Sequence, residues 1–204
     1  MNMKTKKTLG LVLSLVLIVI LADSCKKDKP GNTTTGPVNV TLGQSYGGGI
    51  VGYILKAGDS GYDSAHQHGF IVSAIDQASF VQWSPNGINS LTGATGRAIG
   101  TGKSNTTLIL AAYGSHSNAA GICDTLKLGG YTDWYLPSLA ELDSIMVTTG
   151  PVVGFTNAEI YWSSSEKDDS SANGQSLAQA QLYPAGNYVC LKSVAHPVRM
   201  IRSF

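Results

Sequence analysis

An apolar run of 13 residues, from Leu9 to Leu21, directly follows a basic segment that contains Lys4, Lys6 and Lys7. As a helix at about 1.5 Å per residue this run would be about 20 Å long, shorter than a hydrocarbon core of about 30 Å. A basic segment before a short apolar run is typical of an export signal. We therefore expect residues 1–24 to be a leader that is removed, so that the fold must come from the rest of the chain.

The end of the apolar run carries a second signal. The string Leu21-Ala22-Asp23-Ser24-Cys25 resembles the lipobox of bacterial lipoproteins, although that pattern prefers a small or apolar residue where Asp23 stands. The resemblance implies that Cys25 becomes the lipidated N-terminus and attaches the protein to a membrane. The alternative is ordinary secretory cleavage near Ala22, which leaves Cys25 as a free thiol. The polar run at residues 26–29 suits a membrane tether and favours the lipoprotein.

Residues 25–37 contain no apolar side chain large enough to pack in a core. We expect them to form a flexible tether with a mean reach of about 20 Å. Residues 38–204 are then one domain with a sizeable core. This domain has eight Lys and Arg against eleven Asp and Glu, a net charge of −3. An acidic domain has no electrostatic footprint for nucleic acid, so we expect no nucleic-acid partner.

Three helices are expected in the middle of the chain, each after a polar residue that can cap its first turn. They cover residues 106–113 after Asn105, residues 119–128 after Asn118, and a third segment that begins at Leu139. Ser138 and Glu141 have the spacing of a capping box, in which each side chain satisfies a backbone N–H of the other residue. Gly150-Pro151 marks the expected end of this third helix.

Apolar runs typical of strands lie at both ends of the domain. They are residues 50–55 and 70–75 in the first half, and 160–164, 178–183, 188–191 and 198–201 in the second. The first two flank a polar turn region, so we expect them to pair as a hairpin. Turn residues separate the other four. Strands at both ends with helices between them predict an α+β domain.

Several strings in the domain resemble the C-terminal domain of the Legionella collagen-like adhesins. They are Gly47 to Val51, His68-Gly69, Gly100-Thr101-Gly102 with Asn105-Thr106, Gly129 to Ser138 with Glu141-Leu142, Tyr161 to Glu166, and Val198 to Arg202. The resemblance covers residues 42–204. It implies a C-type-lectin-like fold, which formylglycine-generating enzymes share, and a place among bacterial surface lipoproteins. For the adhesins it also implies binding of sulfated polysaccharide, although no collagen-like repeat is present in this sequence.

These observations predict a non-catalytic ligand-binding or adhesion module on the bacterial envelope, with the outer membrane favoured. The expected partners are the membrane, through lipidated Cys25, and a polysaccharide or a surface protein. By resemblance to lectin-like folds, the ligand surface should lie in the C-terminal third. Its expected residues are Glu166, Asn187, Tyr188, Lys192, Arg199 and Arg202. The last three are interpreted as a basic cluster that would contact a sulfated glycan.

Two other functions stay open. The first is a structural subunit of a surface complex. The second is a polysaccharide-acting enzyme on the same fold, which would need two carboxylates about 5–10 Å apart, and the sequence offers no convincing pair.

Short motifs for other chemistry are weaker. Gly100 to Ser104 ends like a phosphate-binding loop, but Arg97 stands where that motif requires glycine. Gly58 to Gly61 is similar to the nucleophile turn of serine proteases, yet reads as a polar turn. His66 and His68 could supply two metal ligands on one strand face, but no third ligand is near in the sequence. We expect no cofactor and no metal.

The remaining candidates are loop acids, cysteines and tryptophans. Glu166, Asp168, Asp169 and Asn173 could hold Ca²⁺, but solvated loop acids are favoured because lectin signatures are absent. Cys123 and Cys190 could form a disulfide in an exported protein, or stay as two buried thiols. Trp134 and Trp162 could stack on sugars, but core packing is favoured.

Overall fold

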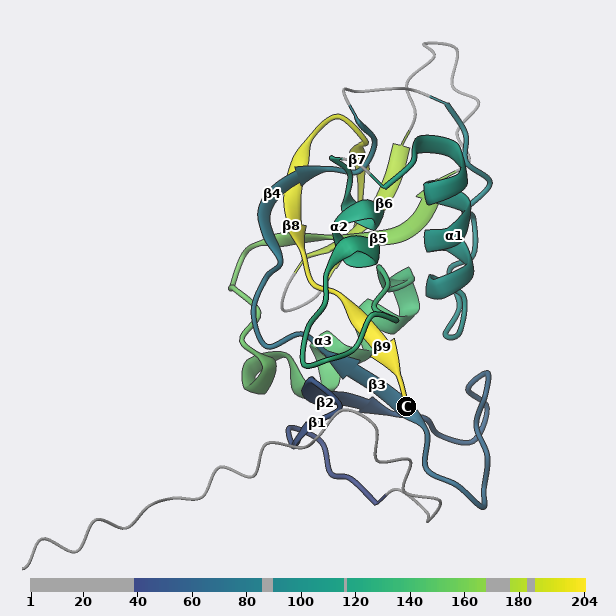
Figure 1. Ribbon diagram of the computed structural model, residues 1–204, viewed down its shortest axis with the longest axis vertical. Coiled ribbons are helices and arrows are strands. Elements are labelled where there is room, and N and C mark those ends of the chain that lie inside the picture. The colour runs from purple at the N-terminus through teal and green to yellow at the C-terminus, as the bar shows by residue number, and fades with distance from the viewer. Residues whose placement is uncertain (1–38, 86–89, 116, 168–176, 183–185) are drawn as a thin grey trace, which may run out of the picture.

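The computed structural model describes residues 39–85, 90–115, 117–167, 177–182 and 186–204 (Figure 1). It is a mixed structure of antiparallel sheets and three helices, so the predicted α+β class is confirmed. The predicted leader, the tether and Cys25 lie outside the described residues. Within the described ranges no helix is both long enough and apolar enough to cross a membrane.

The first sheet joins the two ends of the described chain. It has four strands in the order β1-β2-β3-β9, and all neighbours are antiparallel. Their bounds are Ser45–Tyr46 for β1, Gly49–Ile54 for β2, Gly69–Val72 for β3 and Ile201–Ser203 for β9. The predicted hairpin is β2 with β3 and is confirmed. Gly69 permits its close strand packing, because a Cβ there would lie 2.1 Å from the carbonyl oxygen of Tyr53.

The other strands form two smaller sheets. The bounds are Ala78–Gln82 for β4 and Ala195–Val198 for β8, which pair with each other, and Ile160–Lys167 for β5, Leu177–Leu182 for β6 and Asn187–Leu191 for β7, in the order β5-β6-β7. Strand β5 lies between two apolar clusters. Trp162 packs in one and the next residue back, Tyr161, packs in the other. Both faces of β5 are therefore covered, and the prediction that Trp162 and Trp134 are core residues is confirmed.

The first two helices differ from expectation at their ends. Helix α1 covers Gly102–Tyr113, so Asn105 does not cap it; the N-cap is Thr101. Asn105 is buried, and its side-chain amide donates to the Gly96 carbonyl oxygen at 2.6 Å. Helix α2 covers Ala119–Thr125 and starts with the predicted Asn118 cap, but it ends three residues earlier than predicted.

Helix α3, Leu139–Val153, starts with the predicted capping box. The hydroxyl oxygen of Ser138 accepts from the backbone N–H of Glu141, and the Glu141 carboxylate accepts from the backbone N–H of Ser138. The expected end at Gly150-Pro151 is wrong. The helix includes Pro151 and ends at Val153, and it is followed by the C-cap Gly154, whose left-handed backbone (φ 73°) suits glycine.

Replacing Ser138 with Ala should lower the free energy of unfolding by about 1 kcal/mol, because the N-cap acceptor is lost. The Ser138 hydroxyl also donates to the carbonyl oxygen of Ala98 at 2.9 Å, so two contacts disappear together. Urea unfolding followed by tryptophan fluorescence measures the change. An unaltered midpoint would contradict the role of this cap.

Candidate functional site

The structure separates the six predicted ligand residues into exposed and buried groups. Asn187 and Tyr188 are exposed on β7. Glu166, Lys192 and Arg199 are buried, and the Arg202 side chain is 11% exposed. Each of the three basic side chains pairs with a different carboxylate. The predicted basic surface cluster does not form, because Lys192 and Arg199 are buried and Arg202 is paired with Asp133 near the surface.

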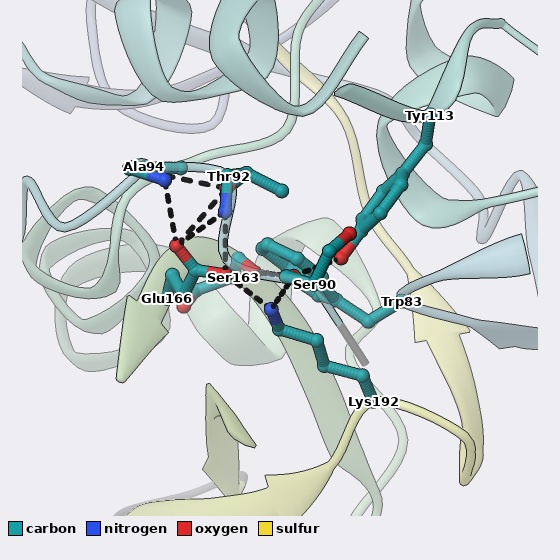
Figure 2. A network of polar contacts seen from close by, with 9 residues as sticks. Trp83, Ser90, Thr92, Ala94, Tyr113, Ser163, Glu166 and Lys192 are labelled. Carbon is teal, nitrogen blue, oxygen red and sulfur yellow. Dashed lines mark hydrogen bonds and ion pairs between the residues drawn. The ribbon is translucent and has the colours of Figure 1, made fainter. Parts of the chain in front are cut away.

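Lys192 and Glu166 form the most enclosed ion pair (Figure 2). Lys192 directly follows β7, while Glu166 lies on β5, and their side chains are 0% and 1% exposed. The ammonium group also donates to the Ser90 carbonyl oxygen at 3.1 Å. It lies 4.5 Å from the ring centroid of Trp83, within range of a cation–π contact. Lys192 therefore links the end of β7 to β5 and to the segment that contains Ser90.

The Glu166 carboxylate also fixes the segment at residues 90–94. It accepts from the backbone N–H groups of Thr92 at 3.0 Å and Gly93 at 2.8 Å, and from the Thr92 hydroxyl at 3.1 Å. The Glu166 backbone N–H donates to the Ala94 carbonyl oxygen at 2.8 Å. Tyr113 on α1 donates its hydroxyl to the Ser90 carbonyl oxygen, so this helix holds the same segment (Figure 2).

Burial lowers the pKa of Lys192, and the adjacent Glu166 carboxylate opposes this effect. Burying two charges has a desolvation cost, and their mutual attraction offsets it only if hydrogen bonds occupy the remaining donors and acceptors. Neither charged group is exposed to a solute. The arrangement can therefore hold the end of β7 and residues 90–94 in a fixed geometry relative to each other.

Arg199 joins three segments at the other end of the fold. Its guanidinium donates to Asp76 at 2.7 Å, and to the carbonyl oxygens of Ser73 at 3.1 Å, Val153 at 2.6 Å and Gly154 at 3.0 Å. The C-terminal end of α3, whose last carbonyl groups have no partner within the helix, is satisfied in this way. Arg199 is therefore a structural contact.

Arg202 lies closer to the surface. It donates to both carboxylate oxygens of Asp133, at 2.7 and 2.9 Å, and its guanidinium lies 3.8 Å from the ring centroid of Tyr131. Partial burial acts to raise the pKa of Asp133, but the contact with Arg202 outweighs it and leaves that pKa below its usual value. Arg202 is thus engaged on one side by a carboxylate and on the other by an aromatic ring.

The segment from Gly100 to Ser104 contains an anion site that the protein fills itself. The Glu141 carboxylate accepts from the backbone N–H of Gly100 at 2.8 Å and of Gly102 at 3.4 Å, at the start of α1. Burial raises the pKa of Glu141, and the backbone N–H groups around it act in the opposite direction. A Cβ on Gly102 would lie 2.2 Å from Oε2 of Glu141. The carboxylate takes the place that a phosphate would need.

The histidines and cysteines are dispersed. Nδ1 of His66 contacts Asp63 at 2.7 Å, and Nδ1 of His68 lies 3.1 Å from the backbone oxygen of Phe204. Among the described residues no three His, Cys, Asp or Glu side chains gather as a metal site would need. Cys123 and Cys190 are both free thiols, and burial raises the pKa of each. The other predicted loop ligands for Ca²⁺, at 168, 169 and 173, lie outside the described residues.

Comparison with known proteins adds no relative. No model of a known protein family matches this chain, and the curated proteins contain no match to it.

Acidification should destabilise the protein through His196. Burial lowers the pKa of this imidazole, which packs against Trp162 at 4.7 Å between ring centroids, and its Nε2 has no partner among the described residues. The unfolded chain therefore binds the proton more readily, so stability falls as pH drops below about 6.5, by at most about 1.4 kcal/mol per pH unit.

Replacing His196 with Gln should flatten this dependence, while replacing the exposed His66 with Gln should not. Urea unfolding at several pH values between about 5 and 7 provides the measurement, around the usual histidine pKa. The same slope in the His196 variant as in the wild type would exclude His196 as its origin.

Proposed function

We propose that this protein is a non-catalytic ligand-binding or adhesion module of the bacterial envelope, related to the C-terminal domain of the collagen-like adhesins. It is attached to the membrane, with the outer membrane favoured, through lipidated Cys25 and the tether at residues 25–37. Its domain has a C-type-lectin-like fold. The ligand is a polysaccharide.

The arrangement of strands supports the lectin-like fold. The N-terminal strands β1, β2 and β3 and the C-terminal β9 share one sheet, which brings the two ends of the domain together (Figure 1). The helices and the smaller sheets form the long excursion between β3 and β9. Fold alone does not specify function, so the proposal depends on the surface as well.

The single observation that carries the proposal is the exposure of Asn187 and Tyr188 on β7, the strand that the buried Lys192 directly follows. Tyr188 is 43% exposed, and the preceding residue, Asn187, is exposed as well. Their side chains project from opposite faces of β7, the outer strand of its sheet, so one ligand can reach both at that edge. A tyrosine ring offers an apolar face for stacking on a sugar, and an amide offers both a donor and an acceptor. Strand pairing with β6 holds the backbone of both residues in place, which reduces the entropy lost on binding.

The burial of the basic side chains argues against the sulfated polysaccharide that the sequence led us to expect. Lys192 and Arg199 are inaccessible, and Arg202 already pairs with Asp133. A neutral or weakly charged polysaccharide fits Asn187 and Tyr188 better than a heavily sulfated one, since the three cations expected to meet sulfate groups are already paired with carboxylates.

Replacing Tyr188 with Ala should weaken polysaccharide binding about tenfold, equal to about 1.4 kcal/mol, because an aromatic contact at the centre of the surface is lost. A glycan array with the full chain first identifies the polysaccharide, and titration then compares the variants. Phe80→Ala is the matched control, since Phe80 is an exposed aromatic residue on β4. Equal losses in both variants would contradict a site on β7, and binding to no glycan would favour the structural-subunit alternative.

A further inference from the structure

Exposed apolar side chains gather at the C-terminal end of α3. Between Asp143 and Glu159 the sequence has no charged residue, although surface helices normally mix charges on their outer face. Val147 is 70% exposed, and Val152 and Pro151 are exposed on the last turn. Val147 and Pro151, four residues apart, lie on one side of the helix.

Two other segments add apolar side chains to this surface. A Cβ on Gly43 would lie 3.0 Å from Cγ1 of Val152, which places the exposed Leu42 next to the helix end. Arg199 donates to both Ser73 and Val153, so the loop after β3, with Ile75 at 69% exposure, also lies close to it. We name this surface the apolar end; its residues are Leu42, Ile75, Val147, Pro151 and Val152.

The position of the apolar end relative to the chain indicates what covers it. The described chain begins at Asn39, three residues before Leu42. For a chain of the composition of residues 25–37, the sequence predicts a mean reach of about 20 Å from the proposed anchor at Cys25. Leu42 and its neighbours are therefore kept closer to the membrane than any part at the opposite end of the domain.

We propose that the apolar end rests on the lipid bilayer and orients the domain. The inference depends on the proposed anchor at Cys25. Aliphatic side chains can enter the interface between headgroups and acyl chains, and their burial adds to the affinity of a lipid anchor. Asp76, next to Ile75, is neutralised by Arg199, and Asp143, one turn before Val147, marks the edge of the surface. In Figure 1, β1, β2 and α3 lie toward one end of the longest axis and β7 toward the other. The domain would thus direct Asn187 and Tyr188 away from the membrane, toward a ligand outside.

Quenching by spin-labelled lipid tests this orientation. The full chain, produced in bacteria and purified from the envelope, is reconstituted into phosphatidylcholine vesicles that contain a headgroup nitroxide lipid. A fluorophore is attached to Val147→Cys, or to Val189→Cys on β7 as the control, each with Cys190→Ser. We expect quenching at least about threefold stronger at position 147, since interfacial apolar faces lie about 5–10 Å deep. Equal quenching at both positions would overturn the proposal. That result is expected if a second copy of the protein, and not lipid, covers the apolar end.

A charge variant and a mass measurement complete the test. Val152→Asp should reduce quenching at position 147 toward the value at 189, while Val194→Asp, in the turn after β7, should not. Mass spectrometry of the N-terminal peptide shows separately whether Cys25 is acylated. If Cys25 is not acylated, the proposed anchor fails, and Cys25→Ser chains are titrated with the same vesicles. If quenching at position 147 then rises with lipid concentration, the apolar end still binds lipid. If quenching does not rise, the proposal that the apolar end rests on lipid is overturned.

Discussion

Replacing Lys192 with Met should lower the free energy of unfolding by about 3–5 kcal/mol, because the Glu166 carboxylate is then buried without a counter-charge. Methionine is unbranched like lysine and only one atom shorter, so the loss is electrostatic more than steric. Glu166 keeps its hydrogen bonds from Thr92 and Gly93, but these do not neutralise it. Urea unfolding at neutral pH measures the change.

Two further variants separate charge from packing. Adding Glu166→Gln to Lys192→Met removes both charges, and this double variant should recover part of the stability. Lys127→Met, at an exposed position, should change stability by no more than about 0.5 kcal/mol. A double variant that is less stable than Lys192→Met alone would contradict the view that the unpaired carboxylate causes the loss.

Replacing Glu141 with Ala should cost about 3 kcal/mol, since the starts of two helices depend on one carboxylate. The backbone N–H groups of Gly100, Gly102 and Ser138 all lose an acceptor, and a buried donor left unsatisfied costs about 1–3 kcal/mol. Glu141→Gln retains an acceptor oxygen and should lose less. Thermal unfolding compares both with Asp124→Ala, an exposed control on α2. Equal stability of the Ala and Gln variants would contradict the acceptor role.

The elements that could be predicted are those whose signals are local. The capping box at Ser138 and the β2–β3 hairpin depend on residues close together in sequence, and both are present. The start of α1 was not predictable in this way. Its first N–H groups bond to Glu141, about 40 residues later, so the helix begins before the polar residue, Asn105, that has the pattern of a cap.

The candidate site also combines features that local sequence predicts with contacts between residues far apart in the sequence. The sequence shows that Lys192, Arg199 and Arg202 are basic, but not that each has an acidic partner. Asp76 lies 123 residues before Arg199, and no periodic pattern links the two. Trp83, which covers the Lys192 ammonium, was not predicted to take part for the same reason. Asn187 and Tyr188, in contrast, lie on the exposed strand β7, and the turn-forming residue types that precede it in the sequence lead one to expect a strand there.

The salt dependence of polysaccharide binding tests the central claim most directly. Binding of the full chain to the polysaccharide found on the array is measured by calorimetry at low and at high ionic strength. If an exposed tyrosine and amide form the site while the basic side chains are structural, the affinity should change by less than about twofold, since salt screens only exposed charges. An affinity that falls tenfold or more with salt, about 1.4 kcal/mol, and that is unaffected by Tyr188→Ala would contradict the account.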